Sequence, residues 1–179
     1  ASVAAAAEGL VVSDEAYVDF GGESALPLVN EYPNLVVTRS FSKSFSLAGV
    51  RLGLVFGRPE LVEELIKVKD SYNVSRFAIA AGIAALDDME WMAANTAKVV
   101  RTRERVIGLL RRSGWKVGDS AANFFWLDCA EEGGRGVYER LRAEGVLVRF
   151  FDVPRLAGGV RITVGDDEQM DRLVALLNP

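Results

Sequence analysis

A single lysine, Lys43, lies among serines and phenylalanines in the stretch SFSKSFSLAGVRLG, which spans residues 40–53. Phe41 and Phe45 would partly shield its amine from water, and desolvation favours the neutral form of an amine. A neutral amine is a nucleophile toward aldehydes. By spacing alone, however, a lysine that follows an apolar stretch is more often a solvated surface charge. Whether Lys43 has a chemical role must therefore be judged from the residues around it.

The same stretch contains groups that could bind a phosphate. Ser40 and Ser42 offer hydroxyl donors, and Arg51 offers a forked guanidinium that matches phosphate oxygens. An amine beside an anion site is what a cofactor with both an aldehyde and a phosphate requires. Pyridoxal phosphate is the candidate that meets both conditions.

Asp14 ends the apolar stretch LVVSD, and Tyr17 follows it three residues later. In open α/β sheets, ligands bind outside the carboxyl ends of the strands, where both side chains would project. An ionised aspartate against the pyridine nitrogen would keep that nitrogen protonated, so that the ring can accept electrons from a substrate. Taken alone, the two residues are equally compatible with a carboxylate that caps a loop and a half-buried tyrosine.

The composition argues against several other classes of protein. The 179 residues include no histidine and one cysteine, Cys129, so no histidine-dependent triad and no internal disulfide can form within the chain. A metal site is not expected either, and Cys129 is interpreted as a small core residue. The formal net charge of -4 argues against nucleic-acid binding. Without a secretory leader or a membrane-length apolar run, a cytoplasmic protein that does not bind membranes is expected.

Hydrophobic patterning predicts the elements that position these residues. An alanine-rich helix end closed by Gly9 precedes three strands, and the apolar run of the third suits a sheet covered on both faces. Long helices follow, and then short strands and helices alternate. The predicted strands are residues 10–17, 34–42, 51–57, 115–118, 122–129, 146–151 and 159–165, and the predicted helices are residues 59–72, 75–88, 89–114, 134–145 and 166–178.

These motifs together resemble those of a known family. VVSDEAYVDF and SFSKSFSLAGVRLG are similar to the cofactor-aspartate and Schiff-base-lysine motifs of the fold-type-I pyridoxal-phosphate-dependent aminotransferases, and within them to the histidinol-phosphate aminotransferase group. YNVS, ANFFWL, VLVRFF and VRITVG follow in the family's order. The resemblance implies an α/β fold, in which residues 1–72 are the C-terminal part of the large cofactor domain and residues 73–179 are the α+β small C-terminal domain.

The resemblance also implies a role for each candidate residue of the first domain. Lys43 would bind the cofactor covalently and, once displaced by substrate, would move a proton between the substrate α-carbon and C4′ of the cofactor. Asp14 would contact the pyridine nitrogen and Tyr17 the phenolic oxygen. The phosphate would be bound by Ser40, Ser42 and Arg51.

Two arginines of the second domain would bind the substrate. By resemblance, Arg161 would clamp its α-carboxylate, and Arg149 would lie near its phosphate or carboxylate. Without the resemblance, both are compatible with ordinary strand arginines that pair with surface acids.

The activity implied is transamination between histidinol phosphate and 2-oxoglutarate, which yields imidazole-acetol phosphate and glutamate in histidine biosynthesis, by a cytoplasmic homodimer. An aromatic aminotransferase, a threonine-phosphate decarboxylase of the same fold and a non-catalytic fragment are the alternatives. Family members are much longer, and their NPTG motif and ring-stacking aromatic belong to an N-terminal half that this sequence lacks. We therefore expect the chain to act as a fragment, with weak cofactor retention and little turnover alone.

Overall fold

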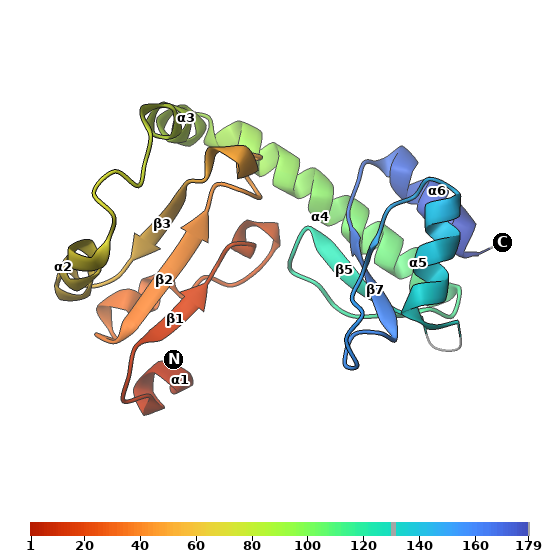
Figure 1. The fold of residues 1–179 in the computed structure, drawn as a ribbon, viewed down its shortest axis with the longest axis horizontal. Coiled ribbons are helices and arrows are strands. Elements are labelled where there is room, and N and C mark those ends of the chain that lie inside the picture. Colours follow the sequence, from red (N-terminus) through yellow and green to blue (C-terminus); the bar gives the residue numbers. More distant parts are fainter. Residues whose placement is uncertain (130–131, 179) are drawn as a thin grey trace. The chain divides into compact units, whose positions relative to one another are not determined.

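The computed structural model describes residues 1–129 and 132–178 and divides into two compact units, Ala1–Ala94 and Asn95–Pro179. Each unit has a sheet of its own and is described by itself (Figure 1). The domain division after residue 72 stays a prediction. Among the helices of the described ranges, none is both long and apolar enough to cross a membrane.

The first unit contains the three-stranded sheet β1-β2-β3. Strand β1 (Val11–Asp14) pairs in parallel with β2 (Leu35–Ser40), and β3 (Gly53–Phe56) pairs antiparallel with β2. Because β1 and β2 are parallel, their carboxyl ends lie at the same edge of the sheet. The segments that follow these two strands are the ones that carry the predicted cofactor residues.

Burial in this sheet is centred on β2. Leu35 and Val37 are buried against Val29 of the 3-10 helix η2 (Leu26–Asn30), and they form the small core of the unit. The apolar run of β3 predicted a sheet covered on both faces, but Val55 of β3 is 50% exposed. Val12 of β1, at the other edge of the sheet, is 55% exposed. No element of the described ranges fully covers these edge-strand side chains.

Helix α1 (Ser2–Ala6) ends earlier than predicted. Its C-cap is Ala7, whose backbone is extended, so Gly9 does not close this helix. The later helices of the unit follow their local signals. Pro59 occupies the first turn of α2 (Pro59–Val68), and the side chain of Ser75 caps α3 (Arg76–Asp87) by accepting a hydrogen bond from an N–H of its first turn.

Helix α4 (Met89–Arg112) begins in the first unit and ends in the second. Gly114 follows it with φ of 91°, and its N–H donates to the Arg111 carbonyl. Left-handed backbone of this kind is favourable for glycine, and it ends a helix by satisfying a free carbonyl. The predicted helix end at Gly114 is confirmed.

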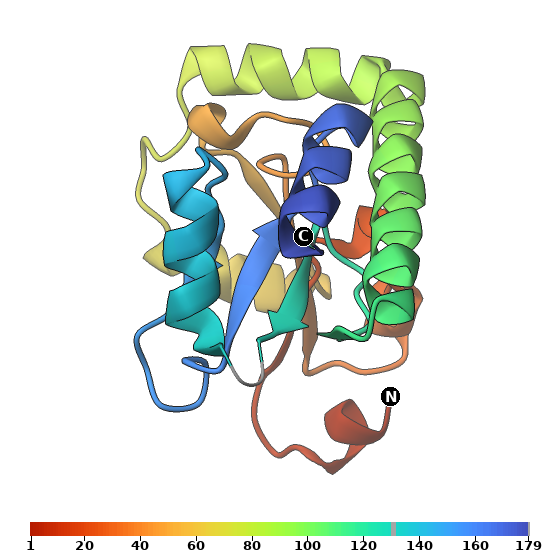
Figure 2. The ribbon, with the colours of Figure 1, turned by 90° about the vertical axis from the view of Figure 1, so that its right-hand side faces the viewer.

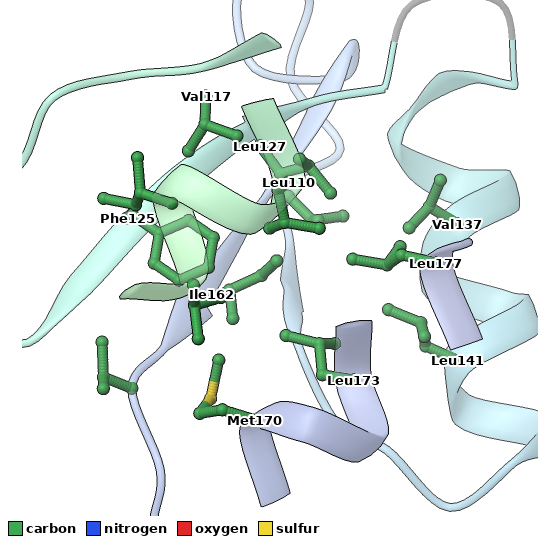
Figure 3. Close-up of a cluster of buried hydrophobic side chains, with 14 of the residues drawn as sticks. Leu110, Val117, Phe125, Leu127, Val137, Leu141, Ile162, Met170, Leu173 and Leu177 are labelled. Carbon is green, nitrogen blue, oxygen red and sulfur yellow. The ribbon is translucent and has the colours of Figure 1, made fainter. Parts of the chain in front are cut away.

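The second unit contains the antiparallel sheet β4-β5-β7-β6, which is made of β4 (Lys116–Val117), β5 (Phe124–Asp128), β7 (Gly159–Thr163) and β6 (Arg149–Phe150). Helices α5 (Gly133–Ala143) and α6 (Asp167–Leu177) lie on one side of it (Figures 1 and 2). Alternate strand residues point toward these helices, as the period of two along a strand requires. The core includes Leu110, Val117, Phe125, Leu127, Val137, Leu141, Ile162, Met170, Leu173 and Leu177 (Figure 3).

Cys129 belongs to this core, with 2% of its surface exposed, as predicted. Burial raises the pKa of its thiol to about 11, and the carboxylates of Glu132 and Asp128 act in the same direction. Only the thiolate reacts with disulfide reagents.

At pH 8 we therefore expect Cys129 of the native chain to react with Ellman's reagent about 100-fold more slowly than Cys129 of the urea-unfolded chain, as measured by absorbance kinetics. Equal rates in the two states would contradict this expectation, and Cys129→Ser should abolish the signal.

Candidate active site

The candidate site is built on the carboxyl ends of β1 and β2. Asp14 is the last residue of β1, and its register partner in β2 is Thr38. The next residue, Glu15, extends the ladder, since its N–H donates to the Thr38 carbonyl at 2.8 Å. The segments that follow both strands therefore leave the same edge of the sheet, and they carry Tyr17 and Lys43.

Lys43 lies over the ring of Tyr17, with 5.4 Å between its Nζ atom and the ring centroid. This distance is typical of a cation–π contact. Phe41 is buried, and its ring centroid is 4.7 Å from that of Phe45. The two phenylalanines thus form the apolar part of the lysine segment, and the Lys43 side chain is itself partly buried.

Asp14 is exposed, and one of its carboxylate oxygens is in use. Its Oδ1 atom accepts the Ala16 N–H at 3.0 Å, which closes a tight turn after β1. The other oxygen, Oδ2, has no hydrogen-bond partner among residues 1–129 and 132–178. The residue therefore caps its loop and still has an acceptor to offer a ligand.

The three candidate phosphate-binding residues also lie at this edge. The Ser40 Oγ atom accepts the Ser42 N–H at 3.1 Å, so its hydroxyl hydrogen remains available to donate. Phe41, which lies between the two serines, donates its N–H to the carbonyl of Leu52 at 3.1 Å. Because Leu52 directly follows Arg51, this hydrogen bond holds the Arg51 backbone close to the serines. The exposed Arg51 guanidinium donates to the Ala48 carbonyl through Nη1, and in the described part of the chain it makes no ion pair. Its other donors are free for an anion.

An ion pair with a buried carboxylate, which the sequence did not predict, joins the two strand ends. Glu15 is 6% exposed, and its carboxylate accepts hydrogen bonds from Nε and Nη2 of Arg39 at 3.1 and 3.0 Å. The Ser24 hydroxyl at 2.8 Å and the Ala25 N–H complete the network. Because Arg39 pairs with Glu15, the basic side chains at this edge that make no ion pair in the described part of the chain are Lys43 and Arg51. Aligning the two predicted strands in parallel would have placed Glu15 opposite the end of β2 and revealed the pair.

The two candidate substrate arginines lie in the second unit, directly opposite each other. Arg149 of β6 pairs with Arg161 of β7, and Trp126 of β5 is the partner of Arg161 on its other side. Like charges at directly opposite positions repel, so this arrangement is unfavourable without a compensating anion. In the part of the chain that the structure describes, neither arginine pairs with a carboxylate.

Aromatic rings orient both guanidinium groups. That of Arg161 lies 5.0 Å from the centroid of the Phe124 ring and 5.9 Å from that of Phe151, and that of Arg149 lies 5.2 Å from the Phe151 ring. The Nε atom of Arg161 is buried and has no hydrogen-bond partner within the described ranges. An unsatisfied buried donor beside a second cation is suited to binding an oxyanion.

The family model for class I and II aminotransferases matches residues 1–177. The chain belongs to this aminotransferase family. Among curated aminotransferases, the histidinol-phosphate aminotransferase of Chromohalobacter salexigens is 47% identical over 173 residues, which cover 95% of this chain and 49% of that protein.

Solved aminotransferase structures have the same fold as this chain. A putative aminotransferase from Burkholderia pseudomallei is 35% identical with a TM-score of 0.81, and it is matched over 94% of this chain and 52% of its own. The histidinol-phosphate aminotransferase of Sinorhizobium meliloti, solved with pyridoxal-5′-phosphate, is 31% identical with a TM-score of 0.82, over 94% of this chain and 48% of its own. The predicted fold class is therefore confirmed. The chain spans about half the length of the aminotransferases that it matches.

Proposed function

We propose that this chain is part of a pyridoxal-phosphate-dependent aminotransferase that transfers the amino group of histidinol phosphate to 2-oxoglutarate. The observation that carries the proposal is the grouping of Asp14, Tyr17, Ser40 and Lys43 at one sheet edge. It is supported by the 47% identity to a histidinol-phosphate aminotransferase. We further propose a cytoplasmic location and a homodimer for the full-length protein, by analogy with the family.

The residues present fit the proposed cofactor. Pyridoxal phosphate supplies an aldehyde that condenses with amines and a ring that accepts electrons from the α-carbon of an amino donor. The Lys43 amine is partly buried beside a ring, Asp14 has a free carboxylate oxygen, and Arg51 has free donors. These are the three kinds of group that an aldehyde, a pyridine nitrogen and a phosphate need.

Each residue would then have a defined role. Lys43 would hold the cofactor covalently and, once freed by the amino donor, its amine would carry the proton taken from the substrate α-carbon. Asp14 would keep the cofactor's pyridine nitrogen protonated, and Tyr17 would offer its phenolic hydrogen to the cofactor's phenolic oxygen. Ser40, Ser42 and Arg51 would hold the phosphate.

Arg161 and Arg149 bind the anionic groups of the substrate. The rings of Phe124 and Phe151 restrict both guanidinium groups, so that little side-chain entropy is lost when an oxyanion binds. In this proposal Arg161 binds a carboxylate, such as that of 2-oxoglutarate. Arg149 binds either a carboxylate or the phosphate of histidinol phosphate.

The choice of amino donor is tested with the full-length protein that contains this chain. Histidinol phosphate, phenylalanine and threonine phosphate are each supplied with 2-oxoglutarate, and the glutamate formed is measured. We expect histidinol phosphate to give a specificity constant at least about 100-fold higher than phenylalanine, because a site that binds a substrate's charged group discriminates strongly against donors that lack it. A higher value for phenylalanine, or release of carbon dioxide from threonine phosphate, would replace the proposed substrate by one of the alternatives.

A further inference from the structure

A hydrogen bond joins the segment that carries Tyr17 to the segment that carries Lys43. The Ser44 hydroxyl donates to Oδ2 of Asp19 at 2.6 Å. Ser44 directly follows Lys43, and it is 3% exposed. Asp19 lies two residues after Tyr17, in the 3-10 helix η1 (Val18–Phe20). The contact therefore connects the immediate neighbours of the two residues that meet at the candidate site.

The lysine segment needs such an anchor because its backbone is strained. Ser46 and Arg51 both have left-handed backbone, with φ of 58° and 59°, which is unfavourable for residues other than glycine. Conformations of this kind persist only where surrounding contacts hold them. A hydrogen bond to a charged acceptor, made by a side chain that water barely reaches, is among the stronger contacts available.

We propose that Asp19 and Ser44 are positioning residues, whose hydrogen bond holds the Lys43 amine over the Tyr17 ring and thereby at the cofactor's aldehyde. This inference rests on the proposed function, because it concerns the reactivity of Lys43 toward pyridoxal phosphate. The physical reason is that attack by an amine depends steeply on its placement. Ser44 controls this placement, since it fixes the backbone next to the Lys43 side chain.

The test measures how fast Lys43 reacts. The chain is mixed with pyridoxal phosphate and sodium borohydride is added at timed intervals from pH 6 to 10, after which the labelled peptides are mapped by mass spectrometry. We expect Ser44→Ala and Asp19→Ala each to slow labelling of Lys43 about tenfold. The double variant should be no slower than either single variant, because one shared contact is lost.

Matched variants separate positioning from loss of stability. Asp19→Asn keeps an acceptor oxygen and should recover most of the rate. Ser71→Ala and Glu23→Gln remove a hydroxyl and a charge at exposed positions, and they should leave the rate unchanged. Urea unfolding is recorded for every variant. Slowing that persists where all variants remain fully folded supports positioning, whereas unchanged labelling in Ser44→Ala, or additive losses in the double variant, would overturn it.

A second readout does not need the cofactor. The Ser46 N–H donates to the Lys43 carbonyl at 3.1 Å, so its hydrogen exchange reports whether the lysine turn is held closed. We expect exchange at Ser46 to become at least about tenfold faster in Ser44→Ala than in the unmodified chain. Unchanged hydrogen exchange at Ser46 would reject the positioning role, whether or not Lys43 is labelled by pyridoxal phosphate. Failure of the full-length protein that contains this chain to be labelled at Lys43 would instead reject the proposed function.

Discussion

Lys43→Ala is expected to remove all cofactor label from the peptide that contains residue 43 when the chain is treated with pyridoxal phosphate and borohydride. In the unmodified chain we expect the Lys43 amine to add to the aldehyde carbon with loss of water, and borohydride would then deliver hydride to the carbon–nitrogen double bond and leave a stable secondary amine. The label is found by peptide mass mapping, and retention by the protein is followed by absorbance. The chain's expected weak affinity lowers the yield without changing the labelled position.

Two other lysines of the same unit serve as controls. Lys67 forms an ion pair with Glu64, and Lys69 donates to the Asp70 carbonyl and to Asn73. Both side chains are exposed, and among the described residues neither lies over an aromatic ring as Lys43 does, so Lys67→Ala and Lys69→Ala should leave the label in place. Label that moves with either of these lysines would remove the cofactor assignment from Lys43.

Loss of the ion pair between Arg39 and the buried Glu15 carboxylate is expected to have the largest effect on stability. Arg39→Met should lower the free energy of unfolding of the first unit by about 3 kcal/mol, because it leaves the Glu15 carboxylate buried without a cation. Glu15→Gln should cost less, since the Arg39 side chain is 30% exposed and can reach water. The loss is measured by native-state hydrogen exchange of the β2 amides, which isolates this unit from the second.

Arg76→Met is the matched control for this prediction. Arg76 is an exposed residue of the same unit at the start of α3, and its replacement by methionine should change exchange in β2 by less than about 0.5 kcal/mol. A similar small change in Arg39→Met would show that Ser24 and the Ala25 N–H suffice to hold the Glu15 carboxylate. The two variants are also compared with each other. If Glu15→Gln lowered the free energy of unfolding more than Arg39→Met, the argument from the burial of Glu15 would be contradicted.

The sequence by itself determined the order of the α-helices and β-strands and several of their ends. It did not predict the three 3-10 helices of the described ranges, and α2 ends at Val68 rather than at residue 72. Pro59, Ser75 and Gly114 mark helix boundaries through local backbone chemistry, and Asp166 forms a capping box with Gln169 at the start of α6. The period-two burial of the strands in the second unit also follows from local chemistry, because the side chains of a strand alternate between its two faces. The motifs around residues 14 and 43 also carried the family resemblance.

Only the tertiary structure decided which distant side chains meet. Glu15 and Arg39 are 24 residues apart, and Asp19 and Ser44 are 25 apart, so no local pattern connects them. The register of the β strands, which depends on packing across the sheet, brought Glu15 to the end of β2 and set Arg149 opposite Arg161. The local pattern also does not determine the exposure of Val55 in β3, because an apolar run shows that a strand can be covered, whereas the elements that cover it come from other parts of the sequence.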